Sequence, residues 1–356
     1  MKKRYLFTIA LLLILTIVYS QRASIAKRIM AKGIEAAMST DTLTDLGEGL
    51  HVALCGAGGP LPDPKRSGAC VAVVAGGKIF VVDAGTNGAR NLNAMRFPIG
   101  EVSRVFLTHF HSDHIDGLGE LATLRWVSAG HTDKLIVIGP AGVKRVTDGF
   151  NDAYSQDSVY RHDHHGESVA PLSGHGMIAV EYPLPADGEI TTVYDEEGLR
   201  VQMLAVDHAP VSPAVAYLFS YQGRSLLVSG DTAKSANLQQ FAEGVDLLIH
   251  EALAPNLVGI MNAAAAKTGN TGMAKITADI LDYHASPVEA AEIARDAGAG
   301  HLLYYHIVPP LLLPGMEAAW LEGVDDVFND YTVGQDGTSF TLPPNSDEII
   351  LTGSGL

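Results

Sequence analysis

The densest group of metal-type side chains lies in residues 108–114, THFHSDH, directly after an apolar, strand-like run. Alternate side chains of a strand point to one face, so His109 and His111 belong together. The turn that follows can bring Asp113 and His114 back toward the same point. Imidazole nitrogens and carboxylate oxygens are ligands that zinc accepts, and manganese and iron accept them too. Two pairs of ligands at one strand end favour two neighbouring metal ions over one closed structural site.

Three further strand-like runs end in ligands of the same type. They are His208 after the run at 199–206, Asp231 at a Gly-flanked turn after 225–229, and His306 at the end of an apolar stretch. A single histidine or aspartate at a strand end is more often a cap or a hydrogen-bonded polar residue. Four strand ends that each carry a metal-type ligand predict one rim on which they converge.

The rest of the chain is expected to supply the strands and helices that hold this rim. Strand signals occur at residues 51–55, 69–75, 78–82, 104–108, 135–138, 177–182, 199–206, 215–221, 225–229, 247–250 and 348–351. Helical signals occur at 118–128, in a segment that ends at Phe150, and at 256–266, 275–282 and 287–297. Such a mixture of strands and helices is typical of two sheets covered by helices. Residues 151–176 are polar and are predicted to form an irregular insert.

The order of these motifs resembles that of the metallo-β-lactamase superfamily, through most of residues 50–308. The resemblance implies an α/β fold, a four-layer αββα sandwich with a metal site at the sheet edges. It also implies a dinuclear site, with one ion held by His109, His111 and His208, a second held by Asp113, His114 and His306, and Asp231 as the bridge. Asp83, at the end of the 78–82 strand, would orient the histidine motif. A simple turn cap is the alternative for Asp83.

Within the superfamily, further details resemble the ribonuclease Z branch. The matching segments are residues 54–60 (LCGAGGP), 114–118 (HIDGL), 250–252 (HEA) and 284–286 (HAS). Leu253 departs from the pattern, because threonine is usual at that place in the branch. The resemblance implies that His284 protonates the leaving oxygen and that Glu251 orients His284. A surface histidine that caps a helix is the alternative for His284.

These resemblances predict an exported hydrolase with two zinc ions as cofactors. A water held by both ions would have its pKa lowered toward neutrality and would attack phosphorus or sulfur as hydroxide. Asp113 would orient this nucleophile, and His284 would act as proton donor. Small phosphodiesters or aryl sulfate esters are the predicted substrates, because cyclic-nucleotide phosphodiesterases and exported arylsulfatases are similar to the same branch. The alternatives are a ribonuclease Z-like 3′-processing endonuclease, a lactonase and, outside the enzymes, a metal-binding scaffold.

The charge balance disfavours a long nucleic acid as partner. The chain has 24 Lys and Arg against 40 Asp and Glu, a formal net charge of −16, and polyanions are normally bound by basic residues that neutralise phosphates. A long basic arm of the kind that ribonuclease Z uses to hold tRNA is not evident. The predicted partner is therefore a small anionic ester. Arg161, His164 and His165, in the 151–176 insert, are candidate substrate-binding residues, with a solvated loop as the alternative.

The first 20 residues have the pattern of an export signal. Residues 2–4 are basic and residues 5–19 are apolar, a run that is somewhat short for a membrane span. The segment is either removed after Ser20 or kept as a membrane tether. Residues 21–48 are predicted to be helical or linker. In both cases the catalytic body, residues 49–356, would lie outside the cytoplasm, in the periplasm or on the membrane.

Cys55 and Cys70 are the two cysteines of the chain and flank a turn between two apolar runs. Export would permit a disulfide between them. Two separately buried thiols are nevertheless favoured. Homodimerisation is expected only because it is common among proteins that resemble this one.

Overall fold

The computed structural model describes residues 2–39 and 42–356, and the chain divides into two compact units, Met1–Asp45 and Leu46–Leu356. The first unit contains α1 (Lys2–Ser39) and most of α2 (Thr42–Leu46). The segment 21–48 is therefore helical over most of its length. Residues 40–41 of that segment, and Met1 of the predicted signal, lie outside the described residues.

Helix α1 passes without interruption through Ser20, the predicted cleavage point. Over Arg4–Ala36 it is long and apolar enough, by length and composition, to cross a membrane. It extends beyond the apolar run at 5–19 because residues 21–36 contain no proline and are rich in good helix formers such as Ala, Lys and Arg. Cleavage after Ser20 or retention of α1 stays a prediction.

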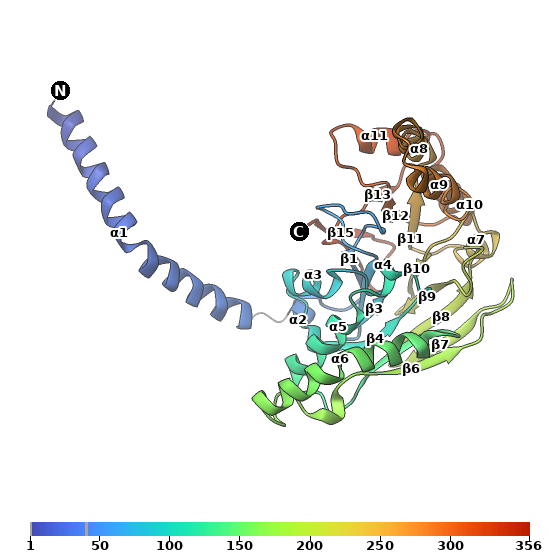
Figure 1. The fold of residues 1–356 in the computed structure, drawn as a ribbon, viewed down its shortest axis with the longest axis horizontal. Coiled ribbons are helices and arrows are strands. Elements are labelled where there is room, and N and C mark those ends of the chain that lie inside the picture. Colours follow the sequence, from blue (N-terminus) through green and yellow to red (C-terminus); the bar gives the residue numbers. More distant parts are fainter. Residues whose placement is uncertain (1, 40–41) are drawn as a thin grey trace. The chain divides into compact units, whose positions relative to one another are not determined.

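Two mixed β-sheets form the second unit (Figure 1). The first runs in the order β15 (Ile350–Ser354), β14 (Thr338–Leu342), β1 (Leu50–Gly56), β2 (Cys70–Ala75), β3 (Lys78–Val82), β4 (Val102–Phe106), β5 (Leu135–Pro140) and β6 (Met177–Tyr182). The second runs in the order β13 (Tyr331–Val333), β12 (His301–Val308), β11 (Leu247–Leu253), β10 (Arg224–Val228), β9 (Val215–Tyr221), β8 (Leu199–Ala205) and β7 (Thr191–Glu196).

Side chains alternate along the strands and fill the space between the two sheets. Leu247 and Ile249 of β11 point into this core, whereas Leu248 points to the outer face of the second sheet. Phe106 of β4 and Phe219 of β9 meet edge to face across the two sheets, with ring centroids 5.6 Å apart. Every residue of β1, β2 and β11 is buried, as expected for strands that are covered on both faces.

Helices cover the outer faces of both sheets. On the first lie α3 (Gly88–Ala94), α5 (Leu118–Ala129) and α6 (Val143–His165); on the second lie α7 (Ala236–Phe241), α10 (Pro287–Ala297) and α11 (Met316–Trp320). Helices α8 (Pro255–Thr268) and α9 (Thr271–Asp279) pack on each other after β11, and α4 (Ser112–Ile115) and two 3-10 turns, Ile99–Glu101 and Leu172–Gly174, complete the set of described helices. The predicted four-layer αββα sandwich is confirmed.

The prediction of an irregular insert over residues 151–176 is wrong for its first part, because α6 continues to His165. The polar composition misled the prediction: α6 buries only a narrow face, formed by Val143, Thr147 and Ser158. A helix on the outside of a sheet can be polar over the rest of its surface. Gly166, with a φ of 75°, ends the helix, and its N–H donates to the carbonyl of His162.

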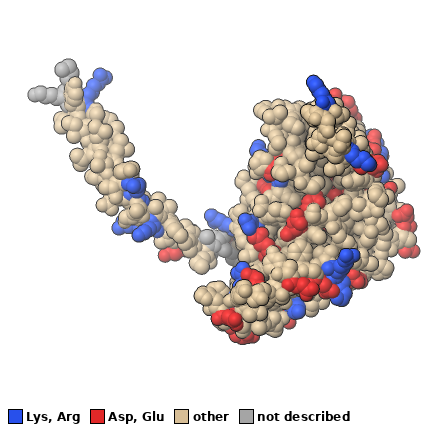
Figure 2. All heavy atoms as spheres, in the orientation of Figure 1, with Lys and Arg blue, Asp and Glu red and all other residues tan. Residues whose placement is uncertain are grey.

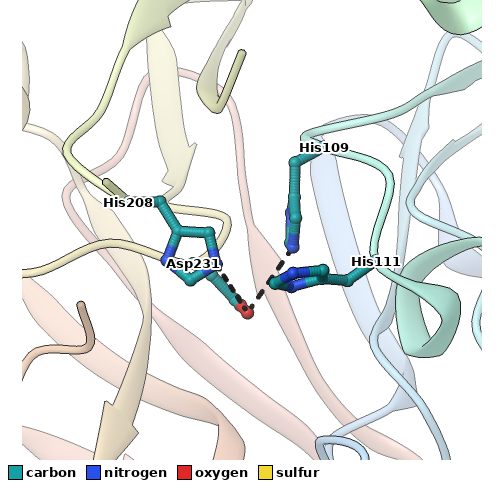
Figure 3. Close-up of side chains that lie close together, drawn as sticks. All are labelled: His109, His111, His208 and Asp231. Atoms are coloured by element: carbon teal, nitrogen blue, oxygen red, sulfur yellow. Dashed lines mark ion pairs between the residues drawn. The ribbon is translucent and has the colours of Figure 1, made fainter. Parts of the chain in front are cut away.

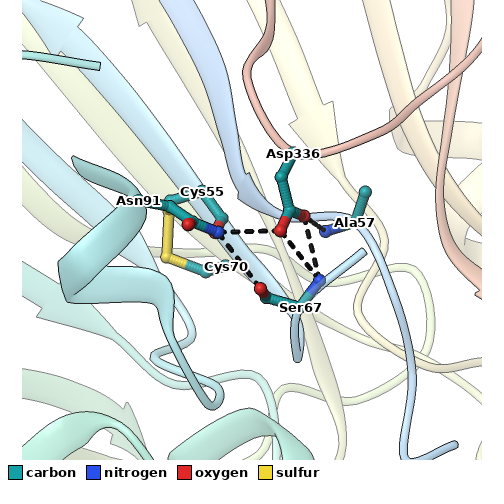
Figure 4. The surroundings of a disulfide bond; sticks show 6 residues. All are labelled: Cys55, Ala57, Ser67, Cys70, Asn91 and Asp336. Carbon is teal, nitrogen blue, oxygen red and sulfur yellow. Dashed lines mark hydrogen bonds between the residues drawn. A yellow bond between two sulfur atoms is a disulfide. The ribbon is translucent and has the colours of Figure 1, made fainter. Parts of the chain in front are cut away.

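Cys55 and Cys70 form a disulfide, so the prediction of two separate thiols is wrong (Figure 4). Strands β1 and β2 are antiparallel neighbours whose register shifts between Leu54 and Gly56. This pairing brings the Cα atoms of the two cysteines to 4.9 Å, within the range that a disulfide spans. The sequence separation alone did not reveal that both cysteines lie on paired strands.

Asp336 holds the loop that this disulfide closes. Its carboxylate accepts hydrogen bonds from the backbone N–H of Ala57 and of Ser67 and from the side-chain amide of Asn91, at 2.8 to 3.0 Å (Figure 4). The loop, residues 57–69, is therefore tied at both ends, and residues 59–61 of this loop are placed beside the predicted ligands.

Candidate active site

The predicted ligands lie at one edge of the sandwich because four strands deliver them there. His109, His208 and Asp231 each come three residues beyond the end of a strand, namely β4, β8 and β10. Strands β8, β10, β11 and β12 all run in the same direction, as their pairing through β9 shows. Their carboxyl ends therefore meet at one edge, where ligands commonly bind in sheets of this kind.

Close packing beneath Asp231 requires glycine at the preceding position. Gly230 has a φ of 61°, and a Cβ atom there would lie 2.8 Å from the carbonyl oxygen of Val215 and 2.9 Å from the Cβ of Thr108. A larger residue would push the end of β10 away from the loop that carries His109. Gly230 thus sets the distance between these two ligands.

A bulge in β12 orients His306. Tyr305 pairs with Glu251 and Ile307 pairs with Ala252, so His306 is left as the extra residue of its strand. Its φ of 47° is in the left-handed region, which is uncommon for a residue other than glycine. Bulges of this type re-aim a side chain next to active sites, and here the bulge directs the imidazole of His306 toward Asp113 and Asp231.

The structure brings all seven predicted ligands together. Their ligand atoms form two groups, each within 4.8 Å: His109, His111, His208 and Asp231 in one, and Asp113, His114 and His306 in the other. Figure 3 shows the three imidazoles of the first group converging on the carboxylate of Asp231. A further group joins Asp231 and His306 to His284.

Asp231 lies at the centre of the cluster. Its carboxylate oxygens are 3.3, 3.5, 3.7 and 3.9 Å from the Nε2 atoms of His114, His306, His109 and His208 respectively. Most of these separations are too long for a hydrogen bond. They are close to the roughly 3.3 Å expected between two tetrahedral ligands that are each about 2.0 Å from one zinc ion. The geometry therefore fits ligands arranged around metal.

The hydrogen bonding of the imidazoles fits metal as well. Among the described residues, the buried Nε2 atoms of His109, His114 and His208 have no hydrogen-bond partner. The Nδ1 atoms of the same rings are held by Thr108 Oγ1, Asp83 and the carbonyl of Tyr283, at 3.1, 2.8 and 2.9 Å. An unpaired buried polar atom costs about 1–3 kcal/mol, and metal ions bound by the two groups would satisfy all three atoms. Rings held at Nδ1 and free at Nε2 are the usual arrangement of metal-binding histidines.

Asp83 anchors the histidine motif from behind. It is buried, and its carboxylate accepts hydrogen bonds from the backbone N–H and hydroxyl of Thr108 and from Nδ1 of His114, each at 2.8 Å. Its φ of 58° turns the chain at the end of β3. Asp83 therefore holds one tautomer of His114, with Nε2 directed at Asp231.

Burial places the first group in the protonation state that binds metal. It lowers the pKa of His109 well below its ordinary value, with a further contribution from His114, and it lowers the pKa of His208. Both rings are therefore neutral near pH 7, the form that can act as a ligand. At Asp113 burial acts against ionisation, but the hydrogen bond with His306 and the charges of His114 and His306 together outweigh it and lower the pKa of the carboxyl.

Glu251 and His284 form a buried pair beside the cluster. Nδ1 of His284 lies 2.9 Å from Oε1 of Glu251, which also accepts hydrogen bonds from the backbone N–H of Thr232 and of Ala285. Burial disfavours the charged ring of His284, but the charge and the hydrogen bond of Glu251, with a contribution from Asp231, together outweigh it and raise the pKa of His284 to about 9. The ring stacks on His306 with centroids 5.6 Å apart. His284 is thus a charged proton donor next to the cluster.

Two cavities reach the cluster from different sides. One, of about 570 Å³, has a mixed lining, formed by residues from the 59–68 loop together with Thr86, Ser112, Asp113 and Asp116. The other, of about 160 Å³, is largely apolar and lies between the cluster and helices α8 and α9. His284 lines the second cavity and not the first.

The three predicted substrate-binding residues lie on helix α6 and not at the cluster. Arg161, His164 and His165 are on the C-terminal turns of α6, and none of them lines either cavity or belongs to a ligand group. Arg161 pairs with Asp157 at 2.6 Å, one turn earlier on the same helix. The structure does not bring these three side chains to the cluster.

Two parts of the site were not found from sequence. Tyr283, whose carbonyl holds His208 and whose ring packs edge to face on it at 4.8 Å, was overlooked although it directly precedes His284. The apolar wall of the smaller cavity, which includes Met261, Met273 and Ile276, was also overlooked. Its residues have ordinary helical spacing and carry no signal that separates a cavity wall from a core face.

Comparison with known proteins identifies the family and agrees with the fold. The sequence profile described as Metallo-beta-lactamase superfamily matches residues 63–270. A ribonuclease Z of Mycobacterium avium is 34% identical over 273 residues, which cover 76% of this chain and 90% of the relative. The chain therefore belongs to the metallo-beta-lactamase superfamily and has ribonuclease Z homologues.

Two solved structures support the same fold. The metallo-beta-lactamase fold protein YhfI of Bacillus subtilis matches with a TM-score of 0.58 and 18% identity, over 83% of this chain and 100% of that protein. The short form of human tRNase Z matches with a TM-score of 0.57 and 19% identity, over 82% of this chain and 99% of that protein. Superfamily members bind divalent metals, typically zinc, and this chain is a metallo-hydrolase of the superfamily.

Proposed function

We propose that this protein is a dinuclear zinc phosphodiesterase that uses a ribonuclease Z-like arrangement of residues. The observation that carries the proposal is the buried pair of Glu251 and His284 placed directly against a complete set of seven ligand side chains. The curated relatives, which are named ribonuclease Z, support phosphodiester bonds as the target. They favour the nuclease-like alternative of the sequence analysis over aryl sulfate esters.

In this proposal His109, His111 and His208 would hold one ion, Asp113, His114 and His306 would hold the other, and Asp231 would contribute to both. Bound zinc supplies Lewis acidity and lowers the pKa of a bound water. The protein contributes the orientation of the ligands, through Asp83 and Tyr283.

Hydrolysis then requires one proton transfer by the chain itself. The oxygen of a water molecule bonds to phosphorus, and the bond between phosphorus and the leaving oxygen breaks. His284 donates its proton from Nε2 to the leaving oxygen, since its Nδ1 is engaged by Glu251. Asp113, which has a lowered pKa, is ionised and accepts a hydrogen bond from the attacking water. This water keeps one proton on the new phosphate oxygen and releases the other to solvent, and His284 regains a proton from solvent.

The charge distribution supports a short substrate. The chain carries a net charge of −16, and Figure 2 shows acidic and basic side chains interspersed on the visible face, without one broad basic stripe. A long RNA would need a row of basic residues to neutralise its phosphates. We therefore propose a small anionic phosphodiester as the substrate.

The test is a rate comparison on the zinc-loaded full chain in detergent. Bis(4-nitrophenyl) phosphate should be hydrolysed with a kcat/KM at least about a hundredfold above that of 4-nitrophenyl sulfate, and Asp231→Asn should remove the activity. A preference for the sulfate would refute the phosphodiesterase assignment. Turnover of neither ester by protein that contains two zinc ions would refute hydrolysis of both ester classes.

We also propose that the catalytic unit is exported. The composition of α1, which suffices to cross a membrane, and the basic residues that precede its apolar run support this. Expression with fractionation and N-terminal sequencing tests the proposal. A chain that starts at Gln21 in the soluble periplasmic fraction indicates cleavage, a full chain in the membrane fraction with its body open to external protease indicates a tether, and a body protected inside the cell refutes export.

A further inference from the structure

The smaller cavity beside the cluster has a polar floor and an apolar wall. The floor contains groups of the candidate active site, among them His284, His306 and Asp231. The wall is formed by α8 and α9 through Val258, Met261, Met273, Ile276 and Ile280. None of these wall side chains is a usual zinc ligand or can donate a proton in hydrolysis, so we ask what group the cavity receives.

The size and the lining of the cavity favour binding of an apolar substituent. Its volume of about 160 Å³ is close to that of an apolar cavity of roughly 150 Å³ known to stay dry and to bind benzene. One aromatic ring or a short alkyl chain fits such a space. The unbranched side chains of Met261 and Met273 can adapt to either shape.

The larger cavity does not offer the same environment. It is lined by the carboxylates of Asp63, Asp113 and Asp116, and its one cationic side chain, Arg66, already pairs with Asp63 at 3.4 Å. Leu61 and three prolines also line it, but an apolar group placed there would take water away from these three carboxylates. The two substituents of a diester would therefore meet different environments: one beside the carboxylates of the larger cavity, the other against the apolar wall of the smaller one.

The position of His284 assigns the apolar cavity to one of these substituents. His284 lines this cavity, and Glu251 occupies its Nδ1, so Nε2 faces the oxygen that leaves. The carbon bound to that oxygen must then continue into the space between α8 and α9. We propose that the substrate carries an apolar leaving group, a single aromatic ring or a short alkyl chain, which binds in this cavity; this rests on the proposed phosphodiesterase function.

A binding measurement tests the cavity without relying on turnover. Calorimetric titration of the zinc-loaded full chain should show phenylphosphonate binding at least about tenfold more tightly than methylphosphonate, because the ring is removed from water. Met261→Gln should reduce this preference to about twofold or less. Ile260→Gln is the matched control, since Ile260 is the preceding residue of α8, is 66% exposed and does not line the cavity. Equal affinity for the two phosphonates, or equal effects of the two variants, would overturn the assignment.

A rate measurement tests the apolar leaving group separately from the proposed phosphodiesterase activity. The wild-type chain should hydrolyse methyl phenyl phosphodiesters with a higher kcat/KM than a dinucleotide such as uridylyl-uridine, whose leaving group is a polar ribose, and Met261→Gln should slow only the phenyl ester. Hydrolysis of the dinucleotide at an equal or higher kcat/KM would keep the phosphodiesterase and refute the apolar leaving group. Tight binding of phenylphosphonate without hydrolysis of any phosphodiester would keep the cavity and refute the proposed function.

Discussion

Replacing Glu251 by Gln should convert His284 from a charged into a largely neutral side chain. The rise in the pKa of His284 from 6.5 to about 9 corresponds to about 3 kcal/mol of preferential stabilisation of the charged ring. At pH 7.5 the wild-type ring favours the charged form by about thirtyfold. Without the carboxylate, burial holds the pKa at or below 6.5, and no more than about a tenth of the rings carry the proton.

The expected loss depends on the leaving group. Rates that need a proton donor should fall at least about tenfold at pH 7.5 in Glu251→Gln, and by about 10²–10⁴ in His284→Ala. An alkyl phosphodiester needs that proton, whereas a 4-nitrophenyl ester leaves readily without it. The donor is the charged form, so the wild-type rate on the alkyl ester should be lost as pH rises through about 9. In Glu251→Gln the loss should begin below pH 7.

The assay is kcat/KM against pH for both esters, with zinc content measured on each sample. Glu292→Gln serves as the control, because this glutamate pairs with Lys234 on the surface, belongs to none of the described ligand groups and lines neither cavity. An equal loss on both esters, or an alkaline limb that does not move in Glu251→Gln, would show that His284 is not the proton donor.

Replacing Cys55 and Cys70 by serine should lower the free energy of unfolding by about 3 kcal/mol, as for a loop of about 15 residues. Urea denaturation measures this difference, and an unchanged midpoint would contradict the disulfide. Asp83→Asn should weaken zinc binding by about 10–100-fold, because an amide holds His114 less firmly. Competition with a chromophoric chelator measures the zinc affinity, and an affinity equal to that of the wild type would contradict this role of Asp83. Zinc at a hundredfold excess over its Kd should stabilise the protein by about 2.7 kcal/mol, seen as a higher melting temperature. Asp231→Ala should lose most of this gain, and a full gain in that variant would exclude Asp231 as a ligand.

The ligand set could be predicted because each ligand follows a short apolar strand and is therefore marked locally. The 108–114 motif, Asp231 and His306 all have this signature, and all lie in the observed cluster. The predicted strands lie within a few residues of observed ones for the same reason, since buried runs such as β3 are nearly continuous. Strands β7, β13 and β14 were not predicted, because they are short or only partly buried. Local pattern is sufficient where the chain buries both faces of an element.

Features that depend on partners distant in sequence could not be predicted in this way. Helix α6 is mostly polar, and only its position against the first sheet explains why it continues beyond Phe150. The bulge at His306 arises from pairing with β11, which no local pattern reveals. The wall that includes Met261 and Met273 becomes a cavity wall only because α8 and α9 pack beside the cluster.

The charged side chains around the site limit the length of the phosphodiester that can bind. Within the larger cavity, the carboxylates of Asp63, Asp113 and Asp116 face a single guanidinium that is already paired. A lone phosphodiester needs one favourable anchor, which metal bound by the histidine cluster would provide. Each additional phosphate on a longer chain would have to lie beside these carboxylates, where charges of like sign repel. The same arrangement that can hold one anionic group therefore opposes a polyanion, and this supports a short diester whose remaining bulk is apolar.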